Sequence, residues 1–335
     1  MRSASLLFFG LISAACLPAQ QPSLSGPVEA YTFDSPTRSL RAVIGIPGAA
    51  SFGPALLENV EFASVAPLQN YGIVFESGKC LFVSGLGSQK IAAVPIAGVD
   101  ARPEGMVWSG DGSAAVLYSR TGKWFQSIAG FPAAPVAQSL VDVSPLGGSF
   151  LAIAVDAPGK QISVAVNGDA AGVYQANSGQ GFTSLVSMSQ PIALSFSSDG
   201  KTLYALDASA VQVTGVSLSG NGFQTFSLPG IANPVGIQSL IDSQNRQLLY
   251  VIGGSDRLLR ILNVASQQIV MDVPLNFQPT MLDQFGSASF VVASRAQSAS
   301  PLWIFSSAPL PAAYFVPAIQ VHPLQRRPGI VRGAL

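Results

Sequence analysis

The sequence predicts an all-β fold built from repeated units, and three observations lead to this prediction. One turn motif recurs, since residues 196–204 read FSSDGKTLY and residues 108–118 read WSGDGSAAVLY. Asp-Gly between two apolar runs favours a hairpin, because glycine adopts a positive φ without steric cost. Almost every other segment is also a short apolar run bounded by turn residues. No segment shows the sustained apolar stripe of a long helix.

Weaker copies of the same turn set the length of the repeat. They lie at residues 65–70, 143–148, 241–245 and 282–286. Aligned on the leading apolar residue, the six copies fall roughly 35 to 53 residues apart, which is near the period of a propeller blade. The repeats therefore predict a ring of blades.

The apolar runs between these turns predict four antiparallel strands per unit, as in a propeller blade. The runs that predict them are residues 71–75, 80–83, 91–96, 114–118, 124–128, 150–155, 162–166, 202–206, 211–216, 248–252, 258–262, 290–293 and 302–305. Six full units extend from about residue 59 to about residue 318. Two earlier runs, residues 28–33 and 40–44, predict a hairpin that completes the last blade and closes the ring. We therefore expect seven blades, with six as the alternative.

One segment before the first full unit has some helical character. Residues 49–57 read AASFGPALL, and Pro54 together with the neighbouring glycines limits any helix there to one turn. The absence of further helical segments argues against an alternating α/β domain.

The composition argues against nucleic acid and other polyanions as partners. Charged residues make up 10% of the 335-residue chain, and 17 basic residues balance 17 acidic ones. A typical protein has about 25% charged residues. With zero net charge the chain has no long-range field to attract nucleic acid. Its partner is expected to be a protein or a neutral small molecule bound at a loop face.

The N-terminus has the pattern of a secretion signal. Arg2 precedes the apolar run of residues 6–12, and small residues follow. The predicted organisation is a signal peptide at 1–19, a flexible lead at 20–27, a propeller at 28–318 and a tail at 319–335. Cleavage after Ala19 would release an extracytoplasmic protein, either periplasmic or secreted. Alternatively, Ser13-Ala14-Ala15-Cys16 resembles a bacterial lipobox, and Cys16 would then carry a lipid anchor. The apolar run is too short for an ordinary transmembrane helix, so no such segment is expected in the mature chain.

Few residues in the chain can carry chemistry. His322, the only histidine, follows the last strand, so a Ser-His-Asp triad would need the tail to fold back. Cys80 lies in a strand-like run and is expected to be a buried apolar residue. Ser198 and Lys201 have a Ser-x-x-Lys spacing, but we expect both to be turn residues. The sequence therefore assigns no catalytic, cofactor-binding or metal-binding residue and predicts no cofactor.

The Ser-x-Asp-Gly turn followed by an apolar-Tyr strand resembles the blade signature of bacterial secreted propellers. These include the YVTN/lactonase-like, TolB-like and WD-repeat groups. The Trp-Asp dipeptide of WD repeats is missing from every copy. The resemblance covers the repeated region and implies the fold more strongly than a function.

Two functions are compatible with this resemblance. The first is a non-enzymatic binding or interaction module. The second, implied by the lactonase-like group, is a hydrolase or lyase that uses channel carboxylates with a divalent metal. The acidic residues expected near the inner strands are Glu61, Glu104, Asp142, Asp242 and Asp283. The alternative is that they are loop or turn residues, since Asp242 and Asp283 occupy the serine position of the turn motif. Trp108 and Phe196 occupy equivalent motif positions, where packing between blades is the expected role and a sugar-binding stack is the alternative.

Overall fold

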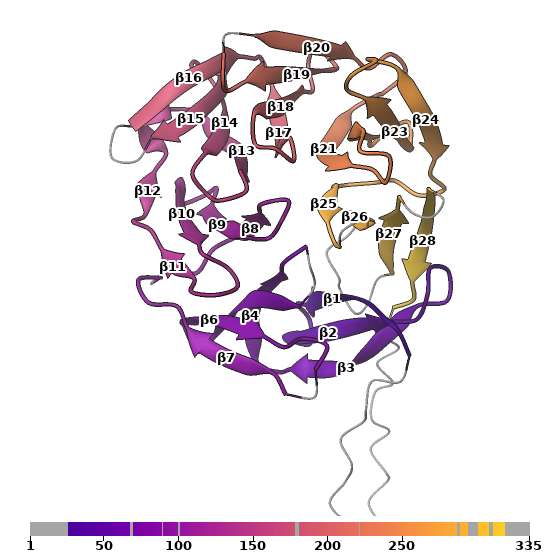
Figure 1. Ribbon diagram of the computed structural model, residues 1–335. Helices are drawn as coiled ribbons and strands as arrows, with labels where there is room; N and C mark the ends of the chain where they lie inside the picture. The colour runs from indigo at the N-terminus through magenta and orange to yellow at the C-terminus, as the bar shows by residue number, and fades with distance from the viewer. Residues whose placement is uncertain are drawn as a thin grey trace, which may run out of the picture.

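The computed structural model is a single seven-bladed β-propeller, with the blades following one another around a ring (Figure 1). It describes residues 26–67, 70–88, 90–99, 101–177, 181–220, 222–286, 289–293, 301–307 and 311–318. The predicted signal peptide, Cys16, His322 and the tail at 319–335 lie outside the described residues. Within the described ranges no helix is long and apolar enough to span a membrane.

Each blade is one antiparallel sheet, and the described strands follow in chain order from the ring centre outward. The first blade contains β1 (Val28–Asp34), β2 (Ser39–Ile44) and β3 (Ser51–Leu57), and the second contains β4 (Val60–Val65), β5 (Tyr71–Glu76), β6 (Lys79–Ser84) and β7 (Ala92–Pro95). The third contains β8 (Gly105–Trp108), β9 (Ala114–Ser119), β10 (Trp124–Ala129), β11 (Val136–Ala137) and β12 (Val141–Asp142), and the fourth contains β13 (Ser149–Val155), β14 (Ile162–Asn167), β15 (Gly172–Asn177) and β16 (Gly181–Ser187). The fifth contains β17 (Pro191–Phe196), β18 (Thr202–Asp207), β19 (Gln212–Ser217) and β20 (Phe223–Ser227), and the sixth contains β21 (Pro234–Ile241), β22 (Gln247–Gly253), β23 (Leu258–Asn263) and β24 (Ile269–Pro274). The seventh contains β25 (Asp283–Gln284), β26 (Ser289–Ala293), β27 (Leu302–Ser306) and β28 (Ala312–Val316).

The six full units predicted from the repeats are confirmed as the second to seventh blades. In the third blade the outer strand is divided, because β11 and β12 both pair with β10. A one-turn 3₁₀ segment, Ser144–Leu146, follows β12.

The prediction that the N-terminal hairpin completes the last blade is wrong. β1 and β2 pair with each other and β2 pairs with β3, so they form a separate first blade. The seventh blade already has four strands of its own. Seven blades therefore arise because a third strand, β3, extends the predicted hairpin.

Residues 49–57, where the sequence allowed at most one helical turn, form no helix, because β3 occupies most of this segment. Pro54 lies in the outermost strand of its sheet, where a missing N–H removes no ladder hydrogen bond on the solvent side. The register between β2 and β3 shifts on either side of Arg41, next to its partner Ala55. Edge position, rather than helix propensity, therefore decides the conformation of this segment.

The hydrophobic core is divided among the interfaces between blades. Tyr71, Ile73 and Phe75 of the second blade pack with Ala115 and Leu117 of the third. The ring closes in the same way, since residues of the first blade such as Val43 join Ile304, Tyr314 and Val316 of the seventh. Because each blade buries both faces against its neighbours, the fold depends on a closed ring.

Candidate ligand site at the turn end of the channel

The Ser-x-Asp-Gly turn has the same hydrogen-bond geometry in the third and fifth blades. In the fifth blade the Ser197 N–H donates to Thr202 O (2.8 Å), and the Gly200 N–H donates to Ser197 O (2.9 Å). The Ser197 hydroxyl donates to Asp199 Oδ1 (2.7 Å) and accepts from the Thr202 N–H (2.9 Å). Ser109, Asp111 and Ala114 repeat these bonds in the third blade. The turn glycines have φ of +76° and +70°, which explains why glycine is needed there.

The sixth blade uses Asp242 at the serine position, as predicted. Its N–H donates to Arg246 O (3.0 Å), and its carboxylate accepts from the Arg246 N–H (2.9 Å). Asn245, with φ of +58°, replaces the glycine.

The predicted copy at residues 143–148 is not an equivalent turn. It joins the outer strand β12 to the inner strand β13, whereas the motif joins an inner strand to the second strand. The corresponding turn of the fourth blade is residues 156–161, where Asp156 N–H donates to Gln161 O (3.0 Å) and Gly159 N–H donates to Asp156 O (2.9 Å). A proline before the glycine, instead of Asp, concealed this copy in the sequence.

The seventh blade also departs from the prediction. Asp283 was expected at the serine position of a turn, but it lies in β25 and pairs with Val291. The turn begins two residues later, where the Phe285 N–H donates to Ser289 O (2.8 Å). The carboxylate of Asp283 therefore belongs to an inner strand, and Asp283 lines the channel.

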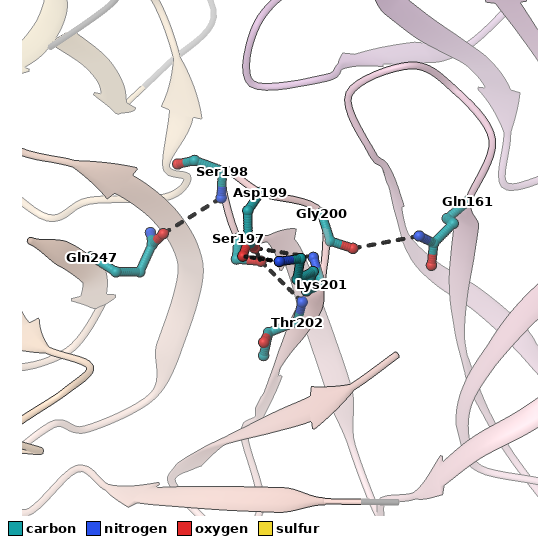
Figure 2. Close-up of polar contacts among 8 residues, drawn as sticks. All are labelled: Gln161, Ser197, Ser198, Asp199, Gly200, Lys201, Thr202 and Gln247. Carbon is teal, nitrogen blue, oxygen red and sulfur yellow. Dashed lines mark hydrogen bonds and ion pairs between the residues drawn. The ribbon is translucent and has the colours of Figure 1, made fainter. Parts of the chain in front are cut away.

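In the second to seventh blades, the turns between the inner and second strands all lie on one end of the ring, which we call the turn face. Polar side chains join neighbouring turns there. Figure 2 shows Gln161 and Gln247 on either side of the fifth-blade turn. Gln161 Nε2 donates to Gly200 O (3.4 Å), and the Ser198 N–H donates to Gln247 Oε1 (3.5 Å). Tyr71 similarly donates its hydroxyl hydrogen to Gly112 O (2.9 Å) in the next blade.

A cavity of about 210 Å³ opens between the inner strands at the turn face. Five consecutive blades, the third to the seventh, contribute to its wall. The polar side chains in the wall are mainly uncharged hydroxyls and amides, and the indole of Trp108 lies beside them. The lining polar residues are Asp111, Ser195, Ser197, Ser198, Gln238, Ser239 and Gln284.

Hydrogen bonds within the protein orient several of these groups. Gln238 Nε2 donates to Leu282 O (3.1 Å) and Gln284 Nε2 donates to Gly286 O (3.3 Å), so the amide oxygen of each can accept from a ligand. Ser195 Oγ accepts from the Ser239 N–H (3.1 Å), and Ser239 Oγ accepts from Gln247 Nε2 (2.6 Å). Each hydroxyl keeps its own hydrogen as a donor. The wall thus offers both donors and acceptors.

The carboxylates near this cavity accept hydrogen bonds from residues of the turns in which they lie. Burial by itself raises the pKa of Asp111, but hydrogen bonds from Ser113 and Ser109 outweigh it and keep the pKa below its usual range. Hydrogen bonds from Ser197 and the Lys201 N–H likewise lower the pKa of Asp199. The Lys201 side chain is 71% exposed and its Nζ lies 3.9 Å from Asp199 Oδ2. Ser198 and Lys201 are turn residues, as expected.

The five acidic residues considered as a metal cluster are placed in different surroundings. Glu61 and Glu104 line one hollow together with Arg38 and Arg102. Asp142 accepts from the Ser144 N–H, Asp242 pairs with Arg246 at 2.7 Å, and Asp283 lines the channel. Among the described residues no three of His, Cys, Asp and Glu form a group that could hold a metal ion.

Cys80 and Trp108 have the packing roles predicted for them. Cys80 is buried, and burial raises the pKa of its thiol to about 12, so the thiolate is not formed near neutral pH. Tyr118 and Tyr204 are buried against Phe150 and Phe226. Trp108 packs on Phe131 with ring centroids 5.0 Å apart, and its Nε1 donates to Ser64 Oγ (3.0 Å). Because Trp108 is only partly buried, it also contributes to the cavity wall.

Comparison with known proteins identifies the fold. No protein-family model matches the chain, and no curated protein sequence matches it. A functionally unknown protein from Desulfotomaculum acetoxidans DSM 771 is similar in structure, with a TM-score of 0.50 and 16% identity, over 74% of this chain and 78% of that one. Hsv2 from Kluyvelomyces marxianus has a TM-score of 0.51 and 10% identity, over 84% and 93% of the two chains. At these identities the similarity shows the propeller fold alone.

Proposed function

We propose that the protein is an extracytoplasmic binding module that takes a neutral, hydroxyl-rich small molecule at the turn end of its channel. The observation that carries the proposal is the cavity wall, in which serine hydroxyls and glutamine amides lie beside the Trp108 indole. Such a wall combines an apolar surface with a few fixed polar groups, which is the usual composition of a small-molecule site.

The charge distribution supports a neutral ligand. The charged residue in the wall is Asp111, and its carboxylate already accepts from Ser109 Oγ (2.8 Å), Ser113 Oγ (2.8 Å) and the Ser113 N–H (3.0 Å). Within the described wall no arginine, lysine or histidine is present to neutralise an anionic ligand. An anion entering the cavity would therefore lose hydration without gaining a cationic partner.

A titration of neutral sugars and polyols tests this proposal. Isothermal titration calorimetry with a panel of neutral mono- and disaccharides should find at least one saturable binder. Gln238→Leu and Gln284→Leu should each weaken that binding about tenfold, as expected for one lost hydrogen bond. Ser219→Ala is the control, because Ser219 lines a neighbouring hollow between the fourth and fifth blades and is not part of this cavity wall. Saturable binding of uronic acids, with no response to neutral sugars, would contradict the proposal.

The location outside the cytoplasm is part of the proposal and has its own test. Its support is the arrangement of Arg2, the apolar run at 6–12 and the small residues up to Ala19. Mass spectrometry of the mature protein should give Gln20 as the first residue. A diacylglyceryl group on Cys16 would instead identify a lipoprotein, and an intact Met1 would contradict export by this route.

A further inference from the structure

The turn that joins β14 to β15 begins with an asparagine followed by a glycine. Asn167 is the last residue of β14, and it pairs with Ser149 of β13. Gly168 has a φ of +114°, which glycine adopts without steric cost. The turn is closed by the Ala171 N–H, which donates to Gly168 O (3.1 Å), and residues 168–170 are exposed. Because β14 starts at the turn face, this turn lies at the other end of the ring, away from the ligand cavity.

The side-chain amide of Asn167 lies next to the peptide nitrogen of Gly168. The Gly168 N–H donates to Asn167 Oδ1 (2.8 Å). A C=O bond of about 1.2 Å joins Oδ1 to Cγ, so Cγ is within about 4 Å of this nitrogen. Rotation about the Cβ–Cγ bond is enough to turn the face of the amide toward the nitrogen. Gly168 has no side chain to obstruct this approach, and among the described residues no other group bonds the Asn167 side chain.

Asn263 provides a comparison, because it also ends a strand, β23, before a turn. Its Oδ1 accepts from the Ala265 N–H (2.9 Å) and the Ser266 N–H (3.1 Å), so its amide is directed toward residues further along the chain. The residue after it is a valine, whose branched Cβ obstructs the peptide nitrogen. In the whole sequence only Asn167 and Asn221 precede a glycine, and Asn221 lies outside the described residues.

We propose that Asn167 is a site of spontaneous deamidation in the folded protein, with water as the co-reactant. The Gly168 nitrogen loses its proton to solvent, and its electron pair forms a bond to Asn167 Cγ. The bond from Cγ to Nδ2 breaks, and Nδ2 takes up a proton and leaves as ammonia. The product is a five-membered succinimide ring. Water then opens this ring at one of its two carbonyls. Opening at Cγ gives aspartate, and opening at the main-chain carbonyl gives isoaspartate, in which the chain continues through Cγ.

The two products differ in their effect on the fold. Aspartate keeps an oxygen at the position of Oδ1, so it can still accept from the Gly168 N–H. Isoaspartate adds one carbon to the main chain at the end of β14. The backbones of Asn167 and Gly148 are in direct contact there, since a Cβ on Gly148 would overlap Asn167 O. An additional main-chain carbon would displace this contact, so isoaspartate should break the pairing of Asn167 with Ser149. This inference does not depend on the ligand proposed above.

Mass spectrometry of proteolytic fragments tests the proposal. The full-length protein and a synthetic peptide of residues 163–173 are incubated in the same mildly alkaline buffer. Asn167 should gain about 1 Da, because a carboxylate replaces the amide. Its rate in the protein should be no less than about a tenth of the rate in the peptide, and Asn263 should convert at least about tenfold more slowly. Intact Asn167 in the protein when the peptide is fully converted would overturn the proposal, as would equal rates at Asn167 and Asn263.

Asn167→Gln is the control variant. Its longer side chain would have to close a six-membered ring, which forms more slowly, so the conversion at residue 167 should be lost. The tryptic fragment that contains Asn167 also contains Asn177. A mass increase that persists in the variant would place the reaction at Asn177 and overturn the proposal.

Thermal denaturation tests the effect of isoaspartate on the fold. Asn167→Asp has the same sequence as the aspartate product and should keep Tm within about 1 °C of the parent protein. The isoaspartate-containing fraction, isolated chromatographically after incubation, should have a Tm lower by at least about 2 °C. Backbone amides of residues 149–150 should also exchange faster in that fraction. Equal Tm values for the two products would overturn the inferred break between β13 and β14.

Discussion

Several described carboxylates of this protein accept hydrogen bonds from turn residues, among them Asp111, Asp199 and Asp207. Asp207 is the most buried example with a resolved shift, and it accepts from Ser209 Oγ (2.7 Å), the Ser209 N–H (2.9 Å) and the Ser189 N–H (3.1 Å). Burial alone raises the pKa of Asp207, but these bonds outweigh it and lower the pKa. Asp111 and Asp199 show the same direction of shift.

These shifts predict a loss of stability in acid. A carboxylate whose pKa is lower in the folded state stabilises the fold above its unfolded pKa, near 4. The stabilisation is lost as the pH falls through the folded value. We expect the free energy of unfolding, measured with urea, to be constant from pH 7 to about pH 5 and to decrease from about pH 4 downward. Asp207→Asn should reduce this dependence. A free energy that rises between pH 4 and pH 3 would contradict the prediction.

Individual residues also show the limit of reading roles from sequence. Trp108 is recognisable as a motif position, and its packing role is confirmed. Its contribution to the cavity wall depends on the tertiary structure, because the wall combines residues from five blades. Gln238 lies outside every predicted turn motif, and Gln284 lies in the predicted copy at residues 282–286. The position of both side chains in the cavity wall follows only from the closed ring.

The turn between inner and second strands is the element that defines the repeat. With the turn of the fourth blade placed at residue 156, the first turn residues are Ala66, Ser109, Asp156, Ser197, Asp242 and Phe285. They are 41 to 47 residues apart, a narrower range than the sequence copies suggested. The copy at residue 143 was misleading because outer-to-inner connections also contain Ser, Pro and Gly.

Two glycines in the turn of the third blade, Gly110 and Gly112, allow a test of whether the positive φ of the turn stabilises the protein. Gly112 has φ of +76°, and a Cβ there would lie 2.8 Å from Tyr71 Oη. A Cβ at Gly110 would have no neighbouring atom within 4 Å, and the φ of Gly110 is not positive. Gly112→Ala should therefore lower the free energy of unfolding by about 1–3 kcal/mol, through backbone strain and loss of the Tyr71 bond.

Gly110→Ala is the control and should change the free energy of unfolding by less than about 0.5 kcal/mol. Both values can be measured by urea denaturation followed by tryptophan fluorescence. Equal effects of the two substitutions would show that the positive φ of the turn is not important for stability.

At the scale of the whole molecule, the first and seventh blades must meet for the ring to close. Their interface has an apolar core that includes Ala30, Val43 and Ile304. It also has the hydrogen bond from Tyr314 to Glu29. Burial, followed by the acceptor Glu29, raises the pKa of Tyr314 above its usual range, so the hydroxyl remains protonated and can donate.

Removing this hydroxyl should weaken closure. Tyr314→Phe is expected to lower the free energy of unfolding by about 1 kcal/mol, because Glu29 loses a partly buried donor. Tyr174→Phe is the matched control, since its hydroxyl bonds Ala170 O at an exposed site (2.7 Å). The two values can be compared by thermal denaturation. A larger effect for Tyr174 would argue against a special role for the closing interface.

The sequence by itself determined that this protein is a β-propeller. Short apolar runs and Asp-Gly turns are local signals, and local steric preference is sufficient to place most strands and the repeat. Tertiary structure alone decided how the ring begins and ends. Residues 51–57 form a strand because they lie at the edge of the first blade, and together with β1 and β2 they make a blade separate from the seventh. The cavities were equally beyond the sequence, since each wall joins side chains from several blades that only closure of the ring brings together.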